Sequence, residues 1–177
     1  VLCNASMDED FDEQLLRDLY AVNPSLDVNE IQSQYPANCN ALMYACKGGK
    51  YNSIKLLLEN GADANTQNNE GETALIRVCA GDFMFRVSDN LINDIAALLL
   101  MHRADTRLRD KNNNTALHFA MRRIDINDDP NYELIRLLLD HNAPVNAQNE
   151  YGKTALMYAV EKRQYRLIQL LLDKKDD

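Results

Sequence analysis

Two short apolar motifs recur along this 177-residue chain, and their spacing constrains the fold more than any other feature. The first motif is an Ala-Leu pair and the second is a triplet of leucines. The pairs begin at Ala41, Ala74, Ala116 and Ala155, and the triplets begin at Leu56, Leu98, Leu137 and Leu170. Each of the first three triplets starts 18 residues before the next pair, so this half of the unit tolerates no insertion. Such strict self-similarity is typical of repeat proteins, in which each unit packs against its neighbours.

The other half of the unit carries all the length variation. From each Ala-Leu pair to its own Leu triplet the offsets are 15, 24, 21 and 15 residues. The shortest offset and the fixed one together give a period of 33 residues, which is the ankyrin period. The chain resembles the ankyrin-repeat family from about residue 36 to 172, in the segments GETALIRVCA, SIKLLLENGADAN, NTALHFAM, LIRLLLDHNAPVN and GKTALMYAV. The resemblance implies an all-α ankyrin-repeat solenoid of helix-turn-helix units with hairpin fingers.

We expect two regions. Residues 1–35 are predicted to form a helical N-terminal cap or a degenerate half repeat, because Phe11, Leu15 and Leu19 share one helical face. Residues 36–177 are predicted to hold four repeats, at about 36–68, 69–110, 111–149 and 150–177. Helix-helix insertions lie near 81–93 and 123–132. The last repeat reads like an internal one, so we expect the natural protein to continue.

The residues around each Ala-Leu pair predict how the first helix of a unit begins. Thr73, Thr115 and Thr154 each stand directly before a pair, in the position of a helix N-cap. The turn positions before them, and those after the second helices, require a positive φ. The positions before the threonines carry Gly71, Asn113 and Gly152. The positions after the second helices carry Gly61, Arg103 and Asn142. Arg103 departs from this pattern, and we expect strain or a changed cap there.

Composition excludes several classes of function. The net charge of -8 argues against nucleic acid and against anionic membrane surfaces, both of which select a basic footprint. No apolar run approaches the length of a membrane span. The four cysteines have neither metal-binding spacing nor the density of a disulfide scaffold. We therefore expect a soluble monomer without a cofactor or metal, in the cytoplasm, or in a host cytosol if the protein is a secreted effector.

His118 is the first residue to weigh for catalysis. In the repeat frame it occupies a buried slot, which Met43, Ile76 and Met157 fill in the other units. We expect it to pack and to make local hydrogen bonds, with a catalytic or ligand role as the alternative. Cys46 and Cys79 align with core-facing positions and are predicted to be buried small hydrophobic residues rather than nucleophiles. The chain is accordingly predicted not to be an enzyme.

The resemblance implies that a protein partner binds the concave face formed by the first helices and the fingers. The position three residues after each Ala, predicted to be exposed there, carries Tyr44, Arg77, Phe119 and Tyr158. One turn further along stand Lys47, Arg122, Arg123, Glu161 and Lys162. Aromatic residues and arginine are enriched at interface hot spots, so we expect a partner segment with acidic and apolar side chains. The alternative is that the aromatic side chains pack on neighbouring repeats.

Two further surfaces complete the predictions. The finger tips form a secondary surface, at Asn69, Glu70, Lys111, Asn112, Glu150 and Tyr151. The apolar residues of the two insertions are expected to cover one another, and the alternative is a second interaction site. A protein-protein interaction module is the predicted function. The alternative function is a substrate-recruiting or regulatory segment of a larger enzyme or secreted effector.

Overall fold

The computed structural model describes residues 27–29, 39–124 and 130–174. Within these ranges the chain forms eight α-helices and no strand. The helices are α3 (Ala41–Lys47), α4 (Tyr51–Glu59), α5 (Ala74–Ala80), α6 (Asp89–Met101), α7 (Ala116–Arg122), α8 (Tyr132–Asp140), α9 (Ala155–Glu161) and α10 (Tyr165–Asp173). The predicted N-terminal cap lies outside the described residues except for 27–29, and so do residues 125–129 of the second insertion.

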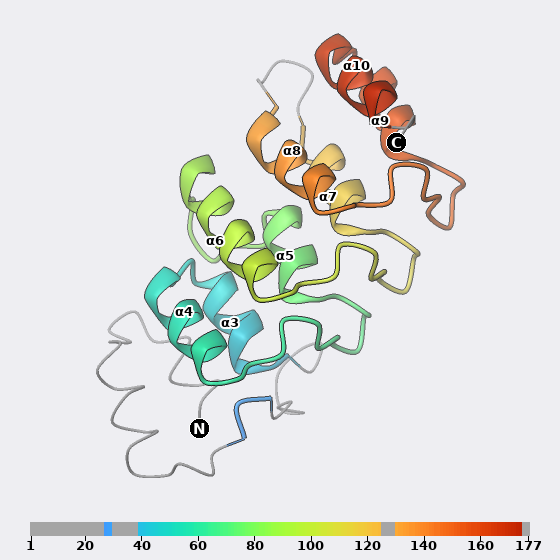
Figure 1. Ribbon diagram of the computed structural model, residues 1–177. Coiled ribbons are helices and arrows are strands. Elements are labelled where there is room, and N and C mark those ends of the chain that lie inside the picture. Colours follow the sequence, from blue (N-terminus) through green and yellow to red (C-terminus); the bar gives the residue numbers. More distant parts are fainter. Residues whose placement is uncertain (1–26, 30–38, 125–129, 175–177) are drawn as a thin grey trace.

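The helices form two layers, as Figure 1 shows. The inner helices α3, α5, α7 and α9 stack on one another in chain order, and each packs against its own outer helix. The outer helices α4, α6, α8 and α10 form the second layer, and long loops project from the stack between successive units. The prediction of an all-α repeat solenoid is confirmed.

Each inner helix begins after a polar N-cap residue, and in α3, α5 and α9 its side chain accepts a hydrogen bond from the first turn. The hydroxyl oxygens of Thr73 and Thr154 accept hydrogen bonds from the backbone amides three residues later, at 3.2 and 3.3 Å. Asn40 does the same for Met43 at 3.0 Å. These bonds satisfy donors that the first turn of a helix otherwise leaves unpaired. The predicted cap positions are therefore confirmed at Thr73 and Thr154, and Asn40 fills the same role in the first unit.

The fingers are built on a recurring side-chain turn. Asn68, Asp110 and Asn149 are buried at the finger bases. One side-chain oxygen of each accepts hydrogen bonds from the amides two and four residues further along, at 2.7–3.0 Å. These side-chain bonds add to the backbone bond that each of the three residues donates to the carbonyl four residues further along, at 2.9–3.1 Å. Successive fingers are joined by backbone bonds, for example from the Lys111 amide to the Glu70 carbonyl at 2.9 Å.

Two turn positions illustrate the backbone constraint. Gly71 has φ +75°, and a Cβ there would lie 3.1 Å from the Asp110 Cα, so the next finger leaves no room for a side chain. Arg103 adopts φ 65° after α6, a conformation that costs a residue with a Cβ free energy. The expected departure at Arg103 is thus a left-handed arginine in a slot that Gly61 and Asn142 fill elsewhere.

The core runs through the whole stack but changes at the last unit. Met43, Ile76 and His118 are each only 1% exposed, whereas Met157 at the equivalent position of α9 is 47% exposed. Val160, two helix positions from Tyr158, is likewise 56% exposed. In the first three units these positions face the next inner helix, and among the described residues nothing covers them on α9.

Candidate interaction surface

The four residues expected to line an exposed concave face lie deeper than the sequence suggests. Tyr44, Arg77 and Tyr158 are each less than one-tenth exposed, and only Phe119 is half-buried. The expectation of exposure is therefore wrong for the first three. The reason is that the base of each finger folds back beside its own inner helix. Asn149 Nδ2, for example, donates a hydrogen bond to the Tyr158 hydroxyl at 3.3 Å.

Arg77 is held between two carboxylates. One guanidinium nitrogen lies 2.9 Å from Glu72 Oε2 at the finger base, and another is hydrogen-bonded to Asp82 at the start of the first insertion. Its Nε has no partner among the described residues. A buried arginine in this position ties the finger to the insertion, and its charge is already neutralised by its own repeat.

His118 joins two repeats. Its Nδ1 lies 2.9 Å from the Thr115 hydroxyl and 3.2 Å from the Thr115 amide, and its Nε2 lies 3.1 Å from the Lys153 carbonyl. A carbonyl can only accept, so Nε2 carries the proton and Nδ1 accepts. Burial is the main cause that lowers the pKa of His118, which favours the neutral ring. The ring therefore acts as a structural bridge, in agreement with the predicted local hydrogen bonding.

The thiols of α3 and α5 are buried in the core. Burial raises the pKa of Cys46 and of Cys79 to about 12, and the nearby charges of Arg77 and Arg123 only partly offset this effect. A thiol is nucleophilic as a thiolate, so neither group is activated at neutral pH. The prediction that both are packing residues agrees with this environment.

Cations stand at the carboxyl ends of three inner helices, α3, α7 and α9. They are Lys47, Arg122, Arg123 and Lys162, of which the two arginines are exposed and the two lysines half-buried. The Arg122 guanidinium carbon lies 5.2 Å above the centre of the Phe119 ring. This cation-π contact keeps Arg122 extended along the edge while its charge stays in water. Within the described ranges, Lys47, Arg122 and Lys162 form no ion pair.

The two other predicted residues on this edge are engaged. Arg123 packs over Gly81, where a Cβ would lie 2.7 Å from its Nε, and its Nη2 lies 3.7 Å from Asp89 Oδ1. The two carboxylate oxygens of Glu161 accept hydrogen bonds from Lys153 Nζ, at 2.8 and 2.9 Å. We call the set Lys47, Arg122, Arg123 and Lys162 the basic edge.

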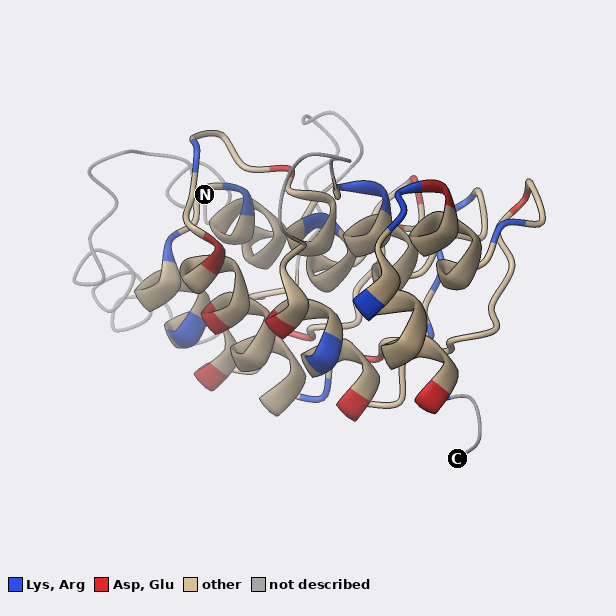
Figure 2. Ribbon diagram, turned by 90° about the horizontal axis from the view of Figure 1, so that it is seen from above, with Lys and Arg blue, Asp and Glu red and all other residues tan. Residues whose placement is uncertain are grey.

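Charge is distributed unevenly over the molecule. The full chain has 27 acidic and 19 basic side chains, which give a net charge of -8. The described residues hold 15 of the acidic and 17 of the basic side chains, so their net charge is +2. Figure 2 shows acidic ribbon segments at the ends of outer helices and several basic segments on the opposite edge. Helices α4, α8 and α10 indeed end at Glu59, Asp140 and Asp173. The overall acidity of the chain therefore does not describe the surface of the stack.

The finger tips are exposed, as predicted for the secondary surface. Asn69, Glu70, Lys111, Asn112, Glu150 and Tyr151 all have exposed side chains. Lys111 and Glu70 form a loose ion pair at 3.6 Å across neighbouring fingers. A hydrogen bond from the Tyr151 hydroxyl to Glu150 raises the pKa of that phenol.

The first insertion packs on the repeat before it. The Met84 amide donates to the Lys47 carbonyl at 2.8 Å, and a Cβ on Gly49 would lie 3.2 Å from Val87 and 3.6 Å from Leu91. Phe85 remains 52% exposed. The expectation that its apolar residues cover those of the second insertion is thus wrong for Phe85, and Ile126 lies outside the described residues.

Polar contacts join the two insertions. Asn131 Nδ2 donates to Asn93 Oδ1 at 2.8 Å, and Asn93 Nδ2 donates to Glu133 Oε2 at 2.9 Å. Between them lies a hollow of about 480 Å³, whose lining includes Val87 and Ile124. The buried Asn93 and the half-buried Asn131 hold the insertions together, because each amide would otherwise lose a partner.

Sequence reasoning missed the polar residues at the finger bases. Asn68, Asp110 and Asn149 stand five residues before Thr73, Thr115 and Thr154, respectively. This fixed offset of an Asn or Asp from the cap threonine is a signal that the sequence offers for the side-chain turns.

Comparison with known proteins agrees with the geometry. A family model described as ankyrin repeats (3 copies) matches residues 83–177, and one described as ankyrin repeats (many copies) matches residues 29–78. The first match alone spans more than half of the chain, so the chain belongs to the ankyrin-repeat family. Repeats of this family generally mediate protein-protein interaction, and the family is generally non-catalytic.

Several relatives are much longer than this chain. An ankyrin repeat protein of Acanthamoeba polyphaga mimivirus is 34% identical over 141 residues, which are 72% of this chain and 24% of the relative. The E3 ubiquitin-protein ligase XBAT33 of Arabidopsis thaliana is 29% identical over 177 residues, 99% of this chain and 31% of the ligase. An ankyrin repeat protein of fowlpox virus is 30% identical over 157 residues, 86% of this chain and 42% of the relative. The chain thus spans less than half of each.

No helix in the described part of the chain is long and apolar enough to cross a membrane.

Proposed function

We propose that this chain is a non-catalytic binding module whose partner segment lies along the basic edge and the adjoining concave face. The partner contacts Lys47, Arg122, Arg123 and Lys162 with carboxylate side chains. Glu161 sets a local boundary, because its carboxylate is held by Lys153 and adds no positive charge to the edge. Tyr44, Arg77 and Tyr158 lie beneath this surface and shape it, and Phe119 is partly accessible beside Arg122.

The row of cations is the observation that carries the proposal. Helices α3 and α7 end at Lys47 and Arg122, and Lys162 directly follows α9; none of these three cations forms an ion pair within the described ranges. Unpaired charges on one edge attract an oppositely charged partner and fix its register on the surface. Such charges contribute little to the stability of the fold itself. Their arrangement is therefore better explained by binding than by packing.

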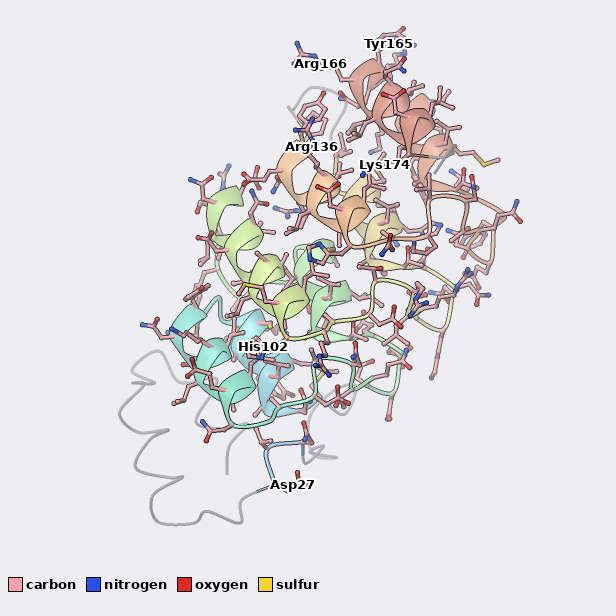
Figure 3. All side chains as sticks on the ribbon, in the orientation of Figure 1. Asp27, His102, Arg136, Tyr165, Arg166 and Lys174 are labelled. Carbon is pink, nitrogen blue, oxygen red and sulfur yellow. The ribbon has the colours of Figure 1, made fainter. Side chains whose placement is uncertain are left out.

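Charge reversal tests the proposal. The variant K47E/R122E/K162E reverses the three cations of the basic edge that form no ion pair within the described ranges, and K55E/R136E/R166E reverses three cations of the outer helices as its control. Figure 3 shows Arg136 and Arg166 pointing away from the stack. Proximity labelling with each chain, after unfolding curves confirm equal stability, should give a partner set that the edge variant loses and the control keeps. Equal labelling by all chains would refute the proposed edge.

A second candidate function rests on one relative. The match to XBAT33 spans 99% of this chain but 31% of the ligase, so the whole of this chain corresponds to one part of an enzyme. In this proposal the stack recruits a substrate or regulates an enzymatic domain elsewhere in a longer protein. Determining the size of the natural protein by immunoblotting decides between the two. A product no longer than the present chain would exclude a covalently attached enzyme.

A further inference from the structure

The first insertion carries two adjacent apolar side chains on the surface. Met84 is 42% exposed and Phe85 is 52% exposed. A single exposed apolar residue needs no explanation, since much of any protein surface is apolar. Two neighbouring large ones, in the middle of the stack and away from the uncovered α9, form a local apolar site.

The backbone that presents these side chains is fixed. The Met84 amide is bonded to the Lys47 carbonyl at 2.8 Å, and the Phe83 amide to the Gly81 carbonyl at 2.9 Å. On the far side, Val87 lies against Gly49. A surface loop held at both ends loses little further freedom when a partner binds, which favours affinity.

Basic residues adjoin the two apolar residues along the backbone. Lys47 is joined to Met84 through the backbone bond, and Arg86 follows Phe85 directly. Arg86 is exposed and has no ion pair within the described segments. Arg123 lines the same hollow as Arg86. The site therefore combines an apolar centre with a positively charged margin.

We propose that Met84 and Phe85 are the apolar anchor of the partner site and that the bound segment places an apolar side chain between carboxylates. This inference rests on the proposed function, whose basic edge supplies the charge but, with Tyr44 and Tyr158 buried, little exposed apolar area. Burial of an exposed Phe and Met gives the affinity that surface ion pairs alone do not. The flanking Arg86 and Lys47 select acidic residues beside the apolar one.

The surrounding acids argue against a nucleic acid as the ligand. Asp82, which pairs with Arg77, and Asp89, which lies 3.7 Å from Arg123, have side chains that are 44% and 57% exposed on the same insertion. A phosphate backbone requires a continuous basic track, which these carboxylates interrupt. A protein segment places its charges singly and can avoid them.

Selection from a phage-displayed library of random peptides, with the full chain as bait, tests the anchor. We expect enriched peptides to join Asp or Glu to Leu, Ile, Met or Phe. Their affinity, measured by fluorescence anisotropy with synthetic peptides, should fall about tenfold or more for M84S/F85S. The matched control M101S/Y165S changes two exposed apolar residues elsewhere and should bind like the wild type.

The outcomes separate the two proposals. Acidic apolar peptides that bind M84S/F85S as well as the wild type, yet are lost with K47E/R122E/K162E, overturn the anchor and leave the basic edge standing. Peptides that lose affinity for M84S/F85S but bind K47E/R122E/K162E like the wild type support the anchor, overturn the edge and leave Arg86 as the cation that selects acidic residues. No enrichment, enrichment of basic peptides, or indifference to both variants overturns the anchor.

Discussion

Replacing His118 with methionine tests the bridge between the third and fourth repeats. Methionine is the residue that stands in this slot in the first and last units. The variant H118M removes the acceptor for the Thr115 amide and the donor for the Lys153 carbonyl. The Thr115 amide lies in a fully buried residue, and an unpaired buried group costs about 1–3 kcal/mol. Apolar contacts of the new side chain offset part of this cost, so we expect a net loss of about 2 kcal/mol.

The loss of stability in H118M should become smaller as the pH falls. Because burial lowers the pKa of His118, the unfolded chain binds more protons than the folded chain between that lowered pKa and about 6.5. The contribution of this histidine is therefore fully present above about pH 6.5 and is lost as the pH falls below it. We expect the stability gap between wild type and H118M to narrow from about pH 7.5 to about pH 5.5.

Urea unfolding followed by circular dichroism at both pH values measures the gap. The exposed His102 provides a control, because H102M removes no buried partner and should change stability by less than about 0.5 kcal/mol at the higher pH. A variant H118M as stable as the wild type would refute the bridge. A gap of the same size at both pH values would refute a buried neutral imidazole.

Three further predictions concern the core and the turns. Cys46 and Cys79, with pKa values of about 12, should resist iodoacetamide at neutral pH until urea unfolds the chain, as mass spectrometry of the labelled peptides would show; rapid native labelling would contradict their burial. Ile76→Ala should lower the free energy of unfolding in urea by about 2–5 kcal/mol, and Met157→Ala should lower it by less than about 1 kcal/mol. Equal losses would mean that α9 is covered. Arg103→Gly should raise stability by about 0.5–1 kcal/mol in the same assay by relieving its positive φ, and a loss would show that the arginine side chain compensates.

The candidate site shows where reasoning from sequence stops. The spacing of the motifs located the inner helices, and the cations one turn beyond Tyr44 and Phe119 do lie on an accessible edge. Exposure of Tyr44, however, depends on how far the finger folds back, which one repeat's sequence does not specify. The accessible position of Phe85 likewise depends on where the first insertion packs.

The sequence by itself determined the repeat, its helix starts and its turns. A constant 18-residue offset, a threonine before three of the pairs and a residue suited to positive φ are local constraints, and each acts within a few bonds of the residues that carry it. Only the tertiary structure decided which side chains remain in water. Tyr158 and Met157 are adjacent residues of α9. Tyr158 is buried because the folded finger contacts it, and Met157 is exposed because no described neighbour covers it. Such contacts join segments far apart in the chain.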